Sequence, residues 1–190
     1  MFTTKELVIG VSGDEGSFSE EAALIYIKKT KIDTFKLQYL INMDGVLAAL
    51  AQGTIDRGVF PVANKNSGLV WPALEAMGKY EFTPIDTIDL NVEQCLFAKT
   101  DLELEQISSI YSFAPAIEQC KKFVRGLKKI PIIDWGDMAK AARDLANGEL
   151  LANAAVLGSR RSAEHYGLQL IATGVQDVKI NTTMFVIASA

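Results

Sequence analysis

Short apolar runs alternate along this chain with stretches that have the composition of helices. Residues 7–11 form a continuous apolar run, which is typical of a strand buried on both faces. A Gly- and Ser-rich loop follows, and then a helix predicted over 20–27, with Ser19 as its candidate N-cap. Because such strand–helix cycles recur almost to the end of the chain, the sequence predicts α/β layers with parallel sheets and right-handed crossovers.

The remaining elements are predicted from the same periodicities and from Gly and Pro stops. Further strands are expected at 35–40, 58–62, 85–90, 95–98, 110–112, 131–133, 154–158, 168–171 and 185–187. Further helices are expected at 46–52, 70–77, a stretch ending near 126, 137–147 and 160–166.

Polar residues gather where several of these strands end. Gly16–Ser19, Asn64–Lys65 and Ser112 fall at predicted carboxyl ends, where α/β sheets bind ligands. The first of these joins a loop to a helix N-terminus, which suits an anion, although the Gly-Lys-Ser/Thr ending of a phosphate loop is missing. A fourth cluster, residues 181–183, lies at the start of the last strand. Its simpler interpretation is that Asn and Thr turn and cap the chain.

Composition excludes several classes of function. With 190 residues, 49% hydrophobic and 22% charged, the chain is long enough for one large domain or two small lobes. A net charge of −4 argues against a nucleic-acid partner. Cys95 and Cys120 lack metal-ligand spacing, and the single histidine, His165, is expected to be structural, so no metal or cofactor is predicted.

The expected location is cytoplasmic. Residues 1–6 lead directly into a predicted strand without the features of a signal peptide. No run approaches the roughly 20 apolar residues that span a membrane, so no membrane association is predicted. Two reduced thiols are the expected state of the cysteines, and a disulfide has no support in the sequence.

Four segments resemble the motifs of the prephenate dehydratase family. Residues 13–22 resemble Gly-Pro-x-Gly-Thr/Ser-Phe/Tyr-Ser-x-x-Ala, and residues 56–68 resemble Asp-x-Gly-Val-x-Pro-Ile/Val-Glu-Asn-Ser-x-x-Gly. Residues 112–120 resemble Ser-His-Pro-Gln-Ala-Leu-x-Gln-Cys, and residues 176–185 resemble Gln-Asp followed by Asn-x-Thr-Arg-Phe. The retained motif residues include Gln119, Cys120, Gln176, Asp177, Asn181, Thr183 and Phe185.

The same segments depart from the family pattern at several positions. Ala63 and Lys65 stand where the family has Glu and Ser, and Met184 stands where it has Arg. The other departures are Asp14 for Pro, Phe113 for His, Ala114 for Pro and Pro115 for Gln. Loss of an arginine that faces a substrate carboxylate would ordinarily cost about 2–5 kcal/mol. Lys65 is therefore proposed as a substitute cation, with a solvated surface lysine as the alternative.

The resemblance spans nearly the whole chain and implies an α/β, two-lobed type II periplasmic-binding-protein-like fold with the active site in the interlobe cleft. The first lobe is expected at 1–84 plus 179–190 and the second at 85–178. The resemblance also implies a homodimer, and no regulatory ACT domain or phenylalanine feedback site is expected here.

The implied activity is that of a decarboxylating lyase on prephenate or a related cyclohexadienyl dicarboxylate, within phenylalanine biosynthesis. By resemblance, Thr183 donates to the leaving hydroxyl and Asn64 positions it. The substrate-binding set implied by the resemblance, with Lys65 added, is Ser17, Phe18, Ser19, Lys65, Ser112, Asn181 and Thr182.

Three functions are compatible with these residues. A dehydratase gives phenylpyruvate, water and CO2, and the retained Thr183 favours it. A non-aromatising prephenate decarboxylase of secondary metabolism gives dihydro-hydroxyphenylpyruvate, and the loss of family polar groups favours it. A non-catalytic paralogue that binds a small carboxylate would also fit those losses.

Overall fold

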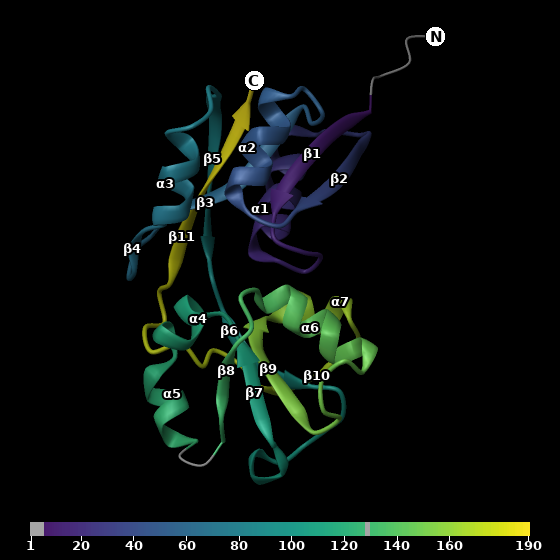
Figure 1. Ribbon diagram of the computed structural model, residues 1–190, viewed down its shortest axis with the longest axis vertical. Helices are drawn as coiled ribbons and strands as arrows, with labels where there is room; N and C mark the ends of the chain where they lie inside the picture. The colour runs from purple at the N-terminus through teal and green to yellow at the C-terminus, as the bar shows by residue number, and fades with distance from the viewer. Residues whose placement is uncertain (1–5, 128–129) are drawn as a thin grey trace. The chain divides into compact units, whose positions relative to one another are not determined.

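The computed structural model describes residues 6–127 and 130–190, and residue contacts divide these into two compact units (Figure 1). Unit 1 comprises the described residues up to Asp14, with Phe18–Leu90 and Thr182–Ala190. Unit 2 comprises Glu15–Ser17 and Asn91–Asn181. Residues 85–90, expected in the second lobe, thus belong to unit 1, and residues 15–17 and 179–181, expected in the first, belong to unit 2. The prediction for residues 1–5 lies outside the described part.

Unit 1 is a mixed sheet with helices on both faces (Figure 1). Its strands run in the order β2-β1-β3-β11-β5, with β4 paired to β3. They are β1 (Leu7–Ser12), β2 (Phe35–Leu40), β3 (Arg57–Asn64), β4 (Gly68–Leu69), β5 (Thr83–Asn91) and β11 (Thr182–Ser189). The helices are α1 (Phe18–Thr30), α2 (Met43–Ala51) and α3 (Trp71–Met77).

The core of unit 1 lies on both faces of this sheet. One cluster packs α1 against β1, β5 and β11 through residues such as Ile9, Ala22 and Phe185. The other packs α2 and α3 against β3 through residues such as Leu50 and Phe60. These side chains are almost completely buried, which explains the continuous apolar runs in the sequence.

Unit 2 repeats the same layering with the strand order β10-β6-β9-β7-β8. Its strands are β6 (Gln94–Ala98), β7 (Ser109–Ser112), β8 (Ile132–Asp134), β9 (Ala154–Ser159) and β10 (Gln169–Ala172). Its helices are the 3-10 turn η1 (Leu104–Gln106), α4 (Ala114–Gln119), α5 (Lys121–Gly126), α6 (Met138–Asn147) and α7 (Arg160–His165). Helices α6 and α7 cover one face, and α5 packs against the other core cluster.

Three expectations from the sequence are wrong in detail. The sheets are not purely parallel, because β11 runs antiparallel to β3 and β6 runs antiparallel to β9 and β10. The helix expected to end near residue 126 is two helices, since the backbone leaves the helical region at Cys120 (φ −117°, ψ 26°). Helix α1 begins at Phe18, so Ser19 lies inside its first turn and is not the N-cap.

Among the described residues, no helix is both long and apolar enough to cross a membrane, and α1, with 13 residues, falls short of the roughly 20 that a span requires.

Candidate functional site

A buried polar pair joins β3 to the last strand in unit 1. In the antiparallel register of β3 and β11, Thr183 lies directly opposite Asn64. The Asn64 Nδ2 donates a hydrogen bond of 2.8 Å to the Thr183 Oγ1. Both residues are buried, at 7% and 8% exposure, although each is polar. The structure therefore brings the two predicted catalytic residues together across the sheet.

The direction of this hydrogen bond is fixed by the turn after β3. The backbone N–H groups of Asn66 and Ser67 both donate to the Asn64 Oδ1, each over 2.9 Å. A backbone N–H can only donate, so that side-chain atom must be the oxygen and the other must be the amide nitrogen. The Thr183 oxygen is consequently an acceptor toward Asn64. Its own hydroxyl proton lies outside this bond and is left to be donated elsewhere.

The turn that orients Asn64 also carries Lys65. The Lys65 backbone N–H donates to the Thr182 carbonyl over 2.8 Å, which holds the turn against β11. The Lys65 side chain is exposed, and Thr182 is half-buried. The structure thus places the Lys65 backbone beside the Asn64–Thr183 pair, while the proposed role of its ammonium group stays a prediction.

Two departures from the family pattern lie opposite each other on neighbouring strands of the sheet. Met184 and Ala63 are direct register partners, and Ala63 also pairs with Leu69 on β4. Because successive side chains of a strand point to opposite faces, this row faces away from Asn64 and Thr183. The row is apolar, with Met184 37% and Leu69 53% exposed.

The predicted serine at the end of β7 is completely buried. The Ser112 Oγ donates to the Leu157 carbonyl on β9 over 2.8 Å. Its carbonyl accepts from the Trp135 N–H after β8 over 2.7 Å. The hydroxyl proton of Ser112 is therefore used to join two strands, and only its oxygen lone pairs could serve a ligand.

The opening loop is anchored by a pair of serines within unit 2. The Gly16 carbonyl accepts hydrogen bonds from the Oγ atoms of Ser159 (2.7 Å) and Ser162 (2.8 Å). Gly16 has a left-handed backbone (φ +82°), and a Cβ there would lie 2.8 Å from the Ser162 Cα. The loop retains glycine because both the conformation and the close approach require it.

The three predicted binding residues after Gly16 differ in environment. Ser17 is half-buried in the loop, and Phe18 is half-buried against the core of unit 1. Ser19 is 5% exposed, and its hydroxyl lies 2.9 Å from that of Ser12. Ser19 therefore also takes part in packing α1 against β1.

A hydrogen-bond network around Gln119 was not foreseen from the sequence. The Gln119 Oε1 accepts from the Asn181 Nδ2 (2.8 Å) and from the Gln94 Nε2 (3.3 Å). The Gln119 carbonyl accepts from the Asp177 N–H, and the Gln94 N–H donates to the Gln176 Oε1. The retained motif residues were its only sequence signal, and that signal did not distinguish a structural network from a binding site.

Asn181 is 1% exposed within this network. Its backbone N–H donates to the Asn91 Oδ1, and its carbonyl accepts from the Val92 N–H. The contacts around Asn181 anchor the segment before β11, and its predicted role in substrate binding stays a prediction.

The cysteines are buried free thiols. Burial is the main cause that raises the pKa of Cys120 to about 12, and burial also raises the pKa of Cys95. Among the described residues, no group of three or more His, Cys, Asp or Glu side chains is placed to hold a metal ion.

Comparisons with known proteins agree with this architecture. A family model described as prephenate dehydratase matches residues 9–190. The bifunctional chorismate mutase/prephenate dehydratase of Buchnera aphidicola subsp. Schizaphis graminum is 27% identical over 180 residues, which cover 93% of this chain and 46% of that protein. The chain spans about half the length of the curated relatives it matches.

Two solved structures show the fold. The prephenate dehydratase of Arthrobacter aurescens in complex with L-Phe has a TM-score of 0.81 at 24% identity, covering 96% of this chain and 60% of that one. A nutrient-binding protein from Burkholderia cenocepacia bound to methionine has a TM-score of 0.56 at 14% identity, covering 95% and 84%. The predicted type II periplasmic-binding-protein-like fold is confirmed, while the expected location of the active site stays a prediction.

Proposed function

Because the chain belongs to the prephenate dehydratase family, we propose that it is a lyase that converts prephenate to phenylpyruvate, water and CO2. The observation that carries the proposal is the polarity of the Asn64–Thr183 hydrogen bond. The amide of Asn64 makes the Thr183 oxygen an acceptor and leaves the hydroxyl proton for the substrate. A donor held in this way is what the departing ring hydroxyl needs.

The chemistry of the reaction sets what the site must supply. The C–C bond to the ring carboxylate breaks and releases CO2, and its electron pair enters the ring. The C–O bond across the ring breaks, and the departing hydroxide takes one proton to become water. A hydrogen bond from Thr183 to that oxygen stabilises the charge that develops on it, and the proton is finally supplied by solvent. Preorganised donors of this kind typically contribute about 10²–10³-fold to kcat.

The groups that hold the substrate carboxylates belong to the same proposal. Ser17 and the start of α1 are the proposed anion-binding groups, because the positive end of the helix dipole at a helix N-terminus favours negative charge. Ser112 offers only its oxygen lone pairs, because its proton is donated to the Leu157 carbonyl, so it could accept a hydrogen bond from a ligand but not hold a carboxylate. Lys65 is the proposed cation of the site, and Lys65→Ala should then raise the KM for prephenate about tenfold. An unchanged KM would assign Lys65 to the solvated surface.

The first experiment is proton NMR of prephenate with the purified protein, followed over time at neutral pH. Aromatic signals of phenylpyruvate that appear faster than without protein support the proposal. Thr183→Val, which keeps the shape of the side chain without its hydroxyl, should slow their appearance about 10²–10³-fold, while Thr183→Ser should keep most of the rate. New olefinic signals would instead indicate a non-aromatising decarboxylase. Prephenate that binds but remains unchanged would indicate a carboxylate-binding paralogue.

A place in phenylalanine biosynthesis follows from the proposed product. A homodimer and a cytoplasmic location are further parts of the proposal and rest on the resemblance and on the sequence.

A further inference from the structure

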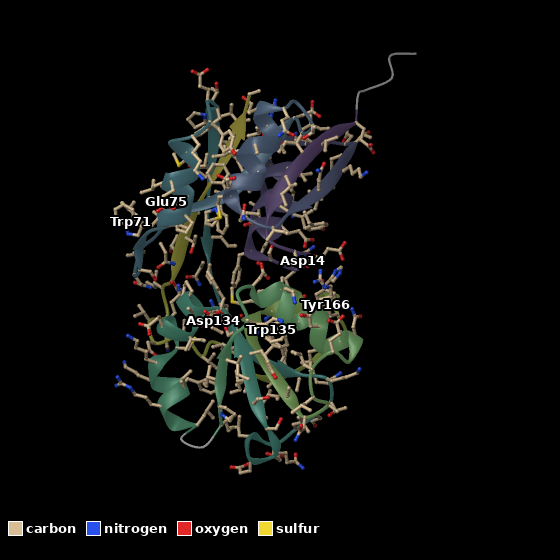
Figure 2. All side chains as sticks on the ribbon, viewed as in Figure 1. Asp14, Trp71, Glu75, Asp134, Trp135 and Tyr166 are labelled. Carbon is tan, nitrogen blue, oxygen red and sulfur yellow. The ribbon has the colours of Figure 1, made fainter. Side chains whose placement is uncertain are left out.

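Two aromatic side chains follow the parallel strands β7 and β8 in unit 2. Ser112 and Asp134 are register partners at the ends of these strands, and Phe113 and Trp135 come directly after them. Both side chains stay open to solvent, at 38% and 37% exposure. Figure 2 shows Asp134 and Trp135 together at this end of the unit. Carboxyl ends of parallel strands are where α/β sheets bind ligands.

Trp135 is fixed in place although it is not covered. Its backbone N–H donates to the Ser112 carbonyl, and its indole Nε1 donates to the Asp144 Oδ2 over 2.8 Å. The Tyr111 ring meets the indole edge to face, with centroids 5.1 Å apart. The Lys140 Nζ lies 5.1 Å from the ring centroid. An aromatic ring held by three contacts, on a backbone that is itself hydrogen-bonded, loses little further freedom when a ligand packs on its remaining surface.

The carboxylate that receives the indole N–H is itself costly to bury. Asp144 is 1% exposed and is also paired with Lys140 and Arg143. A buried carboxylate needs such partners, because burial disfavours its charged form. The chain thus places a charged group inside unit 2 whose hydrogen bond orients an exposed indole. Neither core packing nor a solvated surface would require that orientation.

We propose that Trp135, with Phe113 beside the same strand ends, contacts the six-membered ring of a cyclohexadienyl or aryl carboxylate. The inference rests on the proposed function and adds a residue that determines specificity for the ring. The ring is the flat, uncharged part of prephenate and of phenylpyruvate, and the face of an indole suits it.

The chain allows a direct optical test, because it contains only two tryptophans. Trp71→Phe leaves Trp135 as the single emitter, and Trp135→Phe leaves Trp71, which is 66% exposed on α3, as the matched control (Figure 2). Phenylpyruvate should change the emission of the first variant saturably, and pyruvate, which lacks the ring, should not. The emission of the control variant should fall only in proportion to the light that the added ligand absorbs, without saturation. Unchanged Trp135 emission while calorimetry shows phenylpyruvate bound would overturn the inference.

Two substitutions separate the ring from the hydrogen bond. Trp135→Phe and Trp135→Leu both lose the bond to Asp144, so both should lose similar stability, measured by urea unfolding. Trp135→Leu also loses the aromatic surface, and its Kd for phenylpyruvate should be about tenfold higher than that of Trp135→Phe. Equal Kd values for the two variants would refute the role of the ring.

The outcomes also separate this inference from the proposed function. Turnover of prephenate with unchanged Trp135 emission and equal Kd values refutes the inference and leaves the proposed function standing. Phenylpyruvate binding at Trp135 without any turnover of prephenate supports the inference and counts against the proposed function. A wild-type protein that neither binds phenylpyruvate nor converts prephenate contradicts both.

Discussion

Replacing Asn64 by aspartate should reverse the hydrogen bond on which the proposed chemistry depends. One carboxylate oxygen can still accept from the N–H groups of Asn66 and Ser67, as the amide oxygen does now. In the variant, the other carboxylate oxygen takes the place of the amide nitrogen, which in the native chain donates to the Thr183 Oγ1 over 2.8 Å. A carboxylate cannot donate, so the Thr183 hydroxyl must turn and donate to it. The substitution therefore turns the Thr183 hydroxyl proton away from the substrate, while the size of the side chain at position 64 stays almost unchanged.

The expected cost is large in catalysis and small in folding. Loss of one preorganised donor corresponds to about 10²–10³ in kcat, or roughly 2.7–4 kcal/mol. The buried carboxylate loses hydration, but it gains charge-assisted hydrogen bonds from two N–H groups and one hydroxyl, each worth about 1.5–3 kcal/mol. We therefore expect the free energy of unfolding to change by no more than about 2 kcal/mol. The KM should change less than threefold, since the lost interaction forms only as the hydroxyl departs.

The pH dependence makes this test specific. Protonation of the introduced carboxyl restores a donor toward Thr183, so the kcat of Asn64→Asp should rise as the pH falls, whereas that of Thr183→Val should not. Phenylpyruvate formation is measured by NMR at a series of pH values, and the rate without protein is subtracted at each. A neutral-pH kcat within threefold of the native value would refute the reasoning, and so would a low kcat with no recovery in acid while the fold persists.

Three further predictions follow from other parts of the structure. Ala63→Glu and Met184→Arg together restore the family charges, and the two substitutions should show a favourable coupling of about 0.2–1 kcal/mol in the free energy of unfolding measured with urea. The kcat of this double variant should stay within threefold of the native value. A tenfold gain in kcat would instead assign the arginine to the substrate. Burial opposes ionisation of Asp144, but hydrogen bonds and charges from its cationic neighbours lower its pKa overall, so its contribution to stability is complete above about pH 4 and falls as the pH drops through the lowered pKa. Asp144→Asn should lower the free energy of unfolding by about 3 kcal/mol at pH 7, and it should reduce the loss of stability in acid when urea unfolding is measured at a series of pH values. An unchanged loss of stability in acid would contradict the assignment. With a pKa of about 12, roughly one Cys120 thiol in 10⁴ is ionised at pH 8, so neither Cys120 nor the buried Cys95 should react with a thiol dye unless the chain is unfolded.

Much of the fold could be predicted from local patterns because each strand carries its own burial signal. The continuous apolar run of β1 and the Gly- and Ser-rich loop before α1 predicted those elements from neighbouring residues alone. The direction of β11 could not be obtained in this way. It returns from unit 2 and pairs antiparallel with β3, and such pairing is set by tertiary contacts that leave the local sequence unchanged.

The candidate site was predictable as a set of residue types but not as a geometry. The motifs indicated Asn64 and Thr183, and the structure joins them by a hydrogen bond across the sheet. The motifs also indicated Ser112 and Asn181, whose side-chain donors are used within unit 2. A polar residue that binds a ligand and one that braces a strand have the same sequence signal, and only the partner atoms distinguish them. Trp135 had no motif at all, because its environment is assembled by Asp144 from the following helix.

The family pattern has two charged residues, Glu and Arg, where this chain has Ala63 and Met184, and the two losses are best understood as one change. Sequence alone suggested that an arginine was lost at Met184 and that another cation had to replace it. The register shows Met184 directly opposite Ala63, the position at which the family has glutamate. A glutamate and an arginine at these positions would lie as close as any cross-strand pair, on the face away from Thr183. Removing only one of them would leave an unpaired charge beside the sheet, whereas removing both leaves the apolar row with Leu69. The chain then needs no replacement cation at this position, so the proposed role of Lys65 depends on the KM of Lys65→Ala alone.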